Sequence, residues 1–112
     1  MEISNERDGD TLIVHAAGRV DGSNSQEFQD GLEAVIDDAD RAVVLDLDQL
    51  SYISSSGLRV MLLIARKLQR QQAKFALCSL SDSIREVFEI SGFDRIIPVH
   101  ASRSEAVSAV AG

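Results

Sequence analysis

The chain has 112 residues, of which 45% are hydrophobic and 26% are charged, as expected for one globular domain with a single core. Its net charge of −7, from 18 acidic and 11 basic residues, argues against attraction to nucleic acid or anionic lipid. No stretch offers the ~18 consecutive apolar residues of a membrane span, and the N-terminus lacks a signal-peptide pattern. The single cysteine, Cys78, lies in an apolar run and has no other cysteine to pair with, which fits a reducing compartment. Together these features predict a cytoplasmic protein without membrane insertion.

The first part of the chain predicts a β-hairpin and a helix. Residues 3–6 and 11–17 are strand-like and flank a turn signal at residues 8–10, Asp-Gly-Asp. From residue 24 to residue 38, apolar side chains recur at i, i+4, i+7 and i+8, which is the spacing of one helix face. This pattern predicts a helix that lies on the sheet.

The middle of the chain predicts a buried strand, a long helix and a third strand. Residues 42–45 with Leu47 form an apolar run typical of a strand buried on both faces, and Asp46 and Asp48 are expected to turn toward solvent. A helix is predicted from about residue 56 to residue 71, followed by a strand at residues 74–80.

The last part predicts a helix, an edge strand and a short final helix. The helix around residues 84–88 is expected to end at Gly92 in a left-handed cap. Residues 96–99 are strand-like, but Pro98 lacks an N–H and places this strand at an edge. The final helix is predicted over residues 102–110.

The predicted elements follow the order β-β-α-β-α-β-α-β-α. Two capping boxes are predicted, from Ser23 with Gln26 and from Ser102 with Glu105. Alternation of apolar strands with helices indicates the α/β class, with one mixed sheet of four to five strands and about four helices packed on it. Because no linker or internal repeat divides the chain, a single domain over residues 1–112 is predicted.

Three consecutive serines, Ser54, Ser55 and Ser56, precede the most apolar helix of the chain. A hydroxyl at the N-cap accepts a free backbone N–H, so Ser54 or Ser55 has a sufficient structural reason to be there. The helix dipole and the free N–H groups also tolerate a phosphate at this end, so an exposed hydroxyl there suits a serine kinase. From the residues alone, both interpretations stay open.

The helix after the serines has an unusually wide apolar stripe. Val60 and Ile64 extend it beyond what one sheet face needs, so either neighbouring helices cover them or they form an exposed docking patch. Leu63 falls among the basic side chains of this helix, Arg59, Arg66, Lys67 and Arg70. These cations either contact an acidic partner or form a solvated face.

The segment Tyr52-Ile53-Ser54-Ser55-Ser56-Gly57-Leu58-Arg59 resembles the signature loop of the STAS family, specifically the bacterial anti-sigma-factor antagonists. In that loop an aromatic-aliphatic pair is followed by Asp-Ser-Ser/Thr/Ala-Gly-Leu, which opens a helix. Residues 43–47 resemble the strand before the loop, and Gly18-Arg19-Val20-Asp21 resembles the turn ahead of the first helix. Residues 84–97 resemble the third helix and the strand after it, so the likeness spans essentially the whole chain.

The resemblance implies a STAS-like fold and a regulatory binding protein. In the family, an anti-sigma factor that is also an ATP-dependent serine kinase phosphorylates the Ser after the motif's Asp, and a PP2C-type phosphatase reverses the reaction. That residue is Ser55 here, with Ser54 and Ser56 as alternative acceptors. The unphosphorylated antagonist binds the anti-sigma factor and frees the sigma factor, and the phosphorylated form lets go. Together with the apolar and basic faces of the helix, this predicts a partner-binding surface of Asp21, Ser54, Ser55, Ser56, Gly57, Arg59, Val60, Leu63 and Ile64.

The chain departs from the family motif at Ser54, where the family has Asp. An acid there could orient the acceptor hydroxyl or take its proton, which Ser54 does only weakly. A non-phosphorylated STAS accessory subunit of a transporter or other regulatory complex is therefore a second hypothesis.

An enzyme is the third hypothesis and the least supported by the residues. A serine hydrolase needs a Gly-x-Ser-x-Gly elbow and a His partner, yet the loop lacks the first Gly and only His15 and His100 are present. The acidic pairs Asp37-Asp38 and Asp46/Asp48 are not accompanied by His or Cys, and no phosphate-binding glycine loop occurs. The sequence predicts no catalysis, no cofactor and no metal, and it makes no prediction of oligomeric state.

Overall fold

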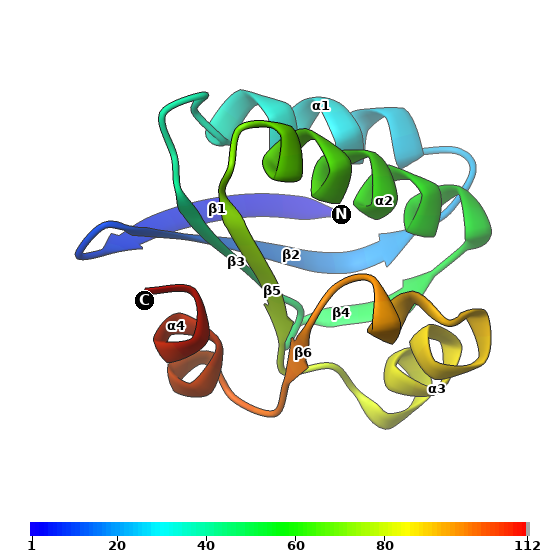
Figure 1. The fold of residues 1–112 in the computed structure, drawn as a ribbon. Coiled ribbons are helices and arrows are strands. Elements are labelled where there is room, and N and C mark those ends of the chain that lie inside the picture. The colour runs from blue at the N-terminus through cyan, green and yellow to red at the C-terminus, as the bar shows by residue number, and fades with distance from the viewer. Residues whose placement is uncertain (112) are drawn as a thin grey trace.

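The computed structural model describes residues 1–111 as a mixed six-stranded sheet with helices on both faces (Figure 1). The strands are β1 (Glu2–Asp8), β2 (Thr11–Val20), β3 (Ala42–Asp46), β4 (Leu50–Ile53), β5 (Lys74–Cys78) and β6 (Val99–His100). The helices are α1 (Ser25–Val35), α2 (Ser55–Arg70), α3 (Asp82–Ser91) and α4 (Arg103–Ala111), with a 3-10 turn, η1, at Phe93–Arg95. The α/β class and the four helices expected from the sequence are confirmed.

The strand order is β1-β2-β3-β5-β6, and β4 lies beside the second half of β2. Strands β1 and β2 form the predicted antiparallel hairpin, with Glu2 opposite Ala17 and Asp8 opposite Thr11. All other neighbouring strands are parallel. Parallel neighbours need crossover connections, and α1, α2 and α3 supply most of that length.

The sheet separates two apolar cores. Helices α1 and α2 bury Phe28 and Met61 over one face, and α3, which packs against β4, adds Phe88 to the same core. On the other face, α4 packs Ala106 and Val110 against β3 and β5. Strand β3 is buried on both faces, as its continuous apolar run predicts.

Cys78 lies in the smaller core under α4 with no exposed area. Burial raises the pKa of its thiol, which keeps the thiol protonated. The predicted core-filling role of this cysteine is confirmed. Within residues 1–111, no helix combines the length and the hydropathy that crossing a membrane requires.

The sheet has one strand more than the predicted maximum of five. The additional strand is β4, for which the sequence pattern predicted no strand. It pairs with β2 only between Gly18 and Val20, and a register shift separates its first pair from the other two. So short a strand, with two exposed residues between two buried ones, has too little periodicity to be recognised.

Two local predictions were wrong because a carboxylate makes contacts that the sequence pattern does not reveal. The hydroxyl of Ser23 donates to the Asp21 carboxylate rather than capping α1, and α1 begins after Asn24 without a side-chain cap bond. Asp46 is 8% exposed rather than solvated, because its carboxylate faces His15 and accepts the N–H of Asp48.

The edge strand is also shorter than predicted. Phe93 O accepts the N–H groups of both Ile96 and Ile97, which keeps these residues in the turn that follows α3. Only Val99 and His100 pair with β5, just after Pro98. The predicted left-handed Gly92 is confirmed, with a φ of 78°.

Candidate functional site

The three serines lie where the ends of two parallel strands meet. Val20, the last residue of β2, pairs with Ile53, the last residue of β4. The backbone N–H of Ser54 then donates to the carbonyl of Val20 at 2.9 Å. The loop that begins at Asp21 and the loop that begins at Ser54 therefore leave the sheet side by side.

Ser54, not Ser55, is the N-cap of α2. Its hydroxyl oxygen accepts the backbone N–H of Gly57 at 3.4 Å and lies 2.8 Å from the hydroxyl oxygen of Ser56. Ser55 is the first helical residue, and its side chain is exposed. The sequence left open whether these serines cap the helix or offer a hydroxyl to a kinase. In the structure the two features belong to different residues, because Ser54 is the cap and Ser55 has the accessible hydroxyl.

Gly57 lets the start of α2 approach the sheet closely. A Cβ at this position would lie 2.7 Å from Ile53 Cγ1 and 2.8 Å from Val20 Cγ1, closer than real Cβ contacts. Both neighbours are buried β-branched side chains with little freedom to move away. Glycine at this position therefore allows the start of α2, and the serines in it, to lie close to the ends of β2 and β4.

Asp21 opens the loop that leaves the sheet beside the serine loop, and hydrogen bonds hold its carboxylate in place. Its carboxylate accepts hydrogen bonds from the hydroxyl and, at 2.9 Å, from the backbone N–H of Ser23. These bonds, the hydroxyl first, lower the pKa of the Asp21 carboxyl below its ordinary value. Asn24 completes the turn by accepting the Asp21 N–H and donating to the carbonyl of Arg19.

The outer face of α2 continues from the serines as a basic surface with an apolar centre. Leu63 is 40% exposed between Arg59, Arg66 and Arg70, which are also exposed. Helix α2 contains no acidic residue, and Lys67 lies 4.0 Å from the Asp38 carboxylate. The chain as a whole carries a net charge of −7, so this helix has the opposite sign to the molecule.

Three of the nine predicted partner-binding residues are buried. Val60 is 4% exposed and Ile64 2% exposed, because α1 packs against this flank of α2, and Gly57 is buried at the strand ends. The hypothesis of an exposed apolar patch at Val60 and Ile64 was therefore wrong. The predicted residues that reach the surface are Asp21, Ser54, Ser55, Ser56, Arg59 and Leu63.

Tyr52 and Arg19 also lie at the surface here, although the sequence did not predict them as site residues. Tyr52 is 40% exposed, and the guanidinium carbon of Arg19 lies 4.4 Å from the centre of its ring. This geometry is a cation–π contact between adjacent strands. The only indication in the sequence was the aromatic residue of the motif. A strand of four residues is too short for its pattern to predict which side chains are exposed.

The two histidines lie elsewhere in the fold. His15 Nε2 is 3.2 Å from Glu6 Oε1 and His15 Nδ1 is 3.5 Å from Asp46 Oδ2, on the side of the sheet that α4 covers. His100 is in β6, beside Cys78 of β5. Over the described residues 1–111, no three His, Cys, Asp or Glu side chains are arranged to hold a metal ion.

Known proteins share the sequence pattern and the fold of this chain. The family model described as "STAS domain" matches residues 2–106. BtrV of Bordetella bronchiseptica, provisionally named an anti-sigma factor antagonist, is 44% identical over 109 residues, covering 97% of this chain and 94% of BtrV. The anti-sigma-B factor antagonist of Listeria monocytogenes is 31% identical over 94 residues, covering 84% of this chain and 82% of that protein. The crystal structure of an anti-sigma factor antagonist from Mycobacterium paratuberculosis has the same fold, with a TM-score of 0.90, 22% identity and coverage of 99% and 94%.

Proposed function

This chain belongs to the STAS-domain family, and we propose that it is an anti-sigma-factor antagonist, a cytoplasmic binding protein that is switched by phosphorylation of Ser55. In the unphosphorylated state it binds an anti-sigma factor, which is also a serine kinase, and so frees a sigma factor. The proposed contact surface consists of Asp21, Ser54, Ser55, Ser56, Arg59 and Leu63, extended by Tyr52. The protein acts by binding, and the kinase and a PP2C-type phosphatase supply the chemistry.

The observation that carries this proposal is the division of roles between Ser54 and Ser55. Because Ser54 caps the helix, the exposed hydroxyl of Ser55 is free to react without loss of the cap. The kinase transfers the γ-phosphoryl group of ATP to Ser55 Oγ, with release of ADP and the hydroxyl proton. The phosphatase hydrolyses the phosphoester to inorganic phosphate and restores the hydroxyl.

Helix α3 supports the idea that α2 tolerates a phosphate at this position. Ser81 caps α3 by accepting the N–H of Ile84 at 3.4 Å, as Ser54 caps α2, and the next residue is Asp82. A negative side chain thus occupies in α3 the position that Ser55 occupies in α2. Such a charge is favourable at a helix N-terminus, so phosphorylation is expected to change the surface and leave the fold intact.

Electrostatics explains why the phosphorylated protein would release its partner. Phosphorylation adds a charge of about −1.5 to −2 next to the ionised Asp21. Burying this group in a protein contact costs desolvation, and the neighbouring like charge adds repulsion. The basic face of α2 would attract an acidic partner surface before phosphorylation, and the phosphate would reduce that attraction.

We would test the proposal with the serine kinase encoded nearest to the gene of this protein. The kinase and ATP are incubated with the wild type, the phosphate is mapped by mass spectrometry, and kinase binding is measured by calorimetry for the wild type, Ser55→Ala and Ser55→Asp. Phosphate is expected on Ser55. Ser55→Ala should bind as the wild type does, and Ser55→Asp should bind at least about ten-fold more weakly.

Ser83→Asp is the matched control, because Ser83 is an exposed serine in the first turn of α3 and the substitution adds the same charge. It should leave binding unchanged. Phosphate on Ser56 alone, or equal losses for Ser55→Asp and Ser83→Asp, would contradict the proposal. Firm binding by all variants without phosphorylation would favour the non-phosphorylated accessory subunit, for which Ser54 in place of the motif's Asp is the supporting observation.

A further inference from the structure

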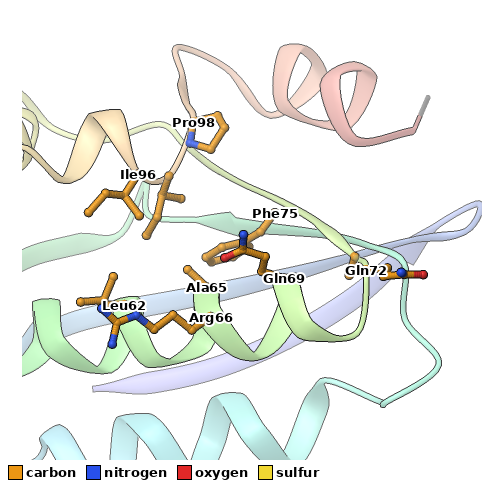
Figure 2. Close-up of a pocket in the computed structure, with 10 residues that line it drawn as sticks. Leu62, Ala65, Arg66, Gln69, Gln72, Phe75, Ile96 and Pro98 are labelled. Carbon is orange, nitrogen blue, oxygen red and sulfur yellow. The ribbon is translucent and has the colours of Figure 1, made fainter.

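The flank of α2 opposite α1 borders an open groove (Figure 2). Leu62, Ala65 and Gln69 of α2 form one wall, and Ile96 and Pro98 form the other (Figure 2). The groove has a volume of about 490 Å³. It begins about two turns of helix beyond Ser55 and follows the C-terminal half of α2.

The groove exists because one helix position on this face of the sheet is empty. Helix α1 covers one flank of α2, but α3 packs against β4 and η1 instead of covering the other flank. The space beside α2 is therefore bordered by Phe75 of β5 and by the turn after η1. Ile96 in that turn is 56% exposed, which is unusual for a large apolar side chain.

The lining indicates what kind of surface would fill the groove. It is mainly apolar, with Arg66, Gln69 and Gln72 as its polar members and no carboxylate among the residues that line it. Arg66 stands at the rim on the basic face of α2, in a chain of net charge −7. An apolar groove with a cationic rim is complementary to a helix that carries apolar residues on one side and acidic residues beside them.

The chain's own α1 is an example of such a helix. It buries Phe28 and Leu32 in the core it shares with α2 and exposes acidic residues on its other side. A second copy of the whole chain is a poor occupant, because a two-fold contact through this groove would bring the two Arg66 side chains and their basic neighbours together. From the apolar lining, the absence of carboxylates and the empty helix position, we propose that the groove binds an acidic amphipathic helix of a partner protein, at a surface distinct from the Ser55 loop.

The test uses fluorescein-labelled synthetic helices of about 16 residues, long enough to be partly helical. One peptide has leucines at i, i+3, i+4 and i+7 with glutamates elsewhere, and its matched partner has lysine in place of every glutamate. Binding is followed by fluorescence anisotropy. The wild type should bind the glutamate peptide, more weakly at high salt, and should not bind the lysine peptide.

Leu62→Glu and Ile90→Glu are matched variants, since each replaces a large apolar side chain by glutamate. Leu62 lines the groove, whereas Ile90 of α3 is 79% exposed and is not among the residues that line it. Leu62→Glu should weaken binding of the glutamate peptide by about ten-fold or more, and Ile90→Glu should not. Arg66→Glu should reverse the preference toward the lysine peptide, which also shows that the variant is folded. Ser55→Asp should leave peptide binding unchanged, so the groove and the phosphorylation switch can fail separately.

Four results would overturn the inference. They are no binding of the glutamate peptide, equal binding of both peptides, equal losses for Leu62→Glu and Ile90→Glu, and a wild-type dimer in sedimentation that Leu62→Glu dissociates. The last result would assign the groove to a second copy of this chain.

Discussion

Ser54 occupies the position that is Asp in the family's signature motif, and both serine and aspartate are favoured N-cap residues. The hydroxyl does the capping here, with Ser56 as its hydrogen-bond neighbour. The hydroxyl is neutral, however, and the first turn of α2 contains no acidic residue. The N-terminus of this helix therefore has no negative side chain of its own. At the scale of one residue, the exchange therefore keeps the helix start and removes a favourable charge–dipole interaction.

Substitutions at Ser54 should separate these two contributions. Ser54→Ala removes the cap and is expected to lower the free energy of unfolding by about 1 kcal/mol. Ser54→Asp keeps a capping oxygen and adds a charge at the positive end of the helix, so its stability should equal or slightly exceed that of the wild type. Urea unfolding followed by circular dichroism measures both. If Ser54→Ala were as stable as the wild type, the assignment of Ser54 as the energetically important cap would fail.

At the scale of elements, most of the fold could be predicted because the apolar patterns are long. The hairpin, the buried run of β3 and the stripe of α2 each involve enough residues for their period to be unambiguous. The features that the sequence did not predict are either short or depend on tertiary contacts. Strand β4 has only four residues, the Ser23 hydroxyl bonds to Asp21 instead of capping α1, and the burial of Val60 and Ile64 depends on the position of α1.

The end of α2 is another feature that a pattern could not reveal. Gln72 has a φ of 62°, and the helix closes with two hydrogen bonds, from Gln72 N to Gln69 O at 3.0 Å and from Ala73 N to Leu68 O at 2.8 Å. This is the Schellman arrangement, in which glycine is usual and glutamine is strained. Helix α3 ends with Gly92 in the same left-handed region.

Opposite substitutions at the two helix ends should therefore have opposite effects. Gln72→Gly should raise the free energy of unfolding by about 0.5–1 kcal/mol, because it relieves the left-handed strain at the cost of a more flexible unfolded chain. Gly92→Ala should lower it by about 1 kcal/mol, since alanine would have to adopt the same backbone. Thermal and urea unfolding check both values. A loss of stability in Gln72→Gly would show that the glutamine side chain contributes more than its backbone costs.

At the scale of the whole molecule, Asp40 connects its own loop to two distant segments, β1 and the end of α2. Its carboxylate accepts Arg7 Nη1 of β1 at 2.8 Å and the backbone N–H of Asp37 at 2.8 Å. Its carbonyl accepts Gln71 Nε2 at the end of α2, also at 2.8 Å. Asp40 is 6% exposed, so its burial acts to raise the pKa of the carboxyl, but the bonds to Arg7 and Asp37 outweigh burial and lower it.

The sign of the pH dependence follows from that lowered pKa. Near the ordinary aspartate value of 3.8, the unfolded chain binds a proton at Asp40 more readily than the folded chain does, so stability rises with pH there. The contribution of Asp40 is complete above that value and is lost as the pH falls through the lower, folded pKa. Asp40→Asn lacks the ionised partner for Arg7 at every pH.

Asp40→Asn should therefore be less stable than the wild type by about 1–3 kcal/mol at pH 7, as expected when a buried hydrogen-bonded carboxylate is replaced. The difference should shrink as the pH falls below about 4, because protonated Asp40 then resembles the amide. Urea midpoints at several pH values between neutral and acid measure this difference, and comparison of the two proteins cancels the titration of other carboxylates. Asp38→Asn is the control, since Asp38 is 93% exposed in the same loop and should change stability by less than about 0.5 kcal/mol at any pH. A deficit for Asp40→Asn that stayed constant down to strong acid would mean that packing around Arg7 and Asp37, and not the ionised carboxylate, holds the hairpin to the rest of the fold.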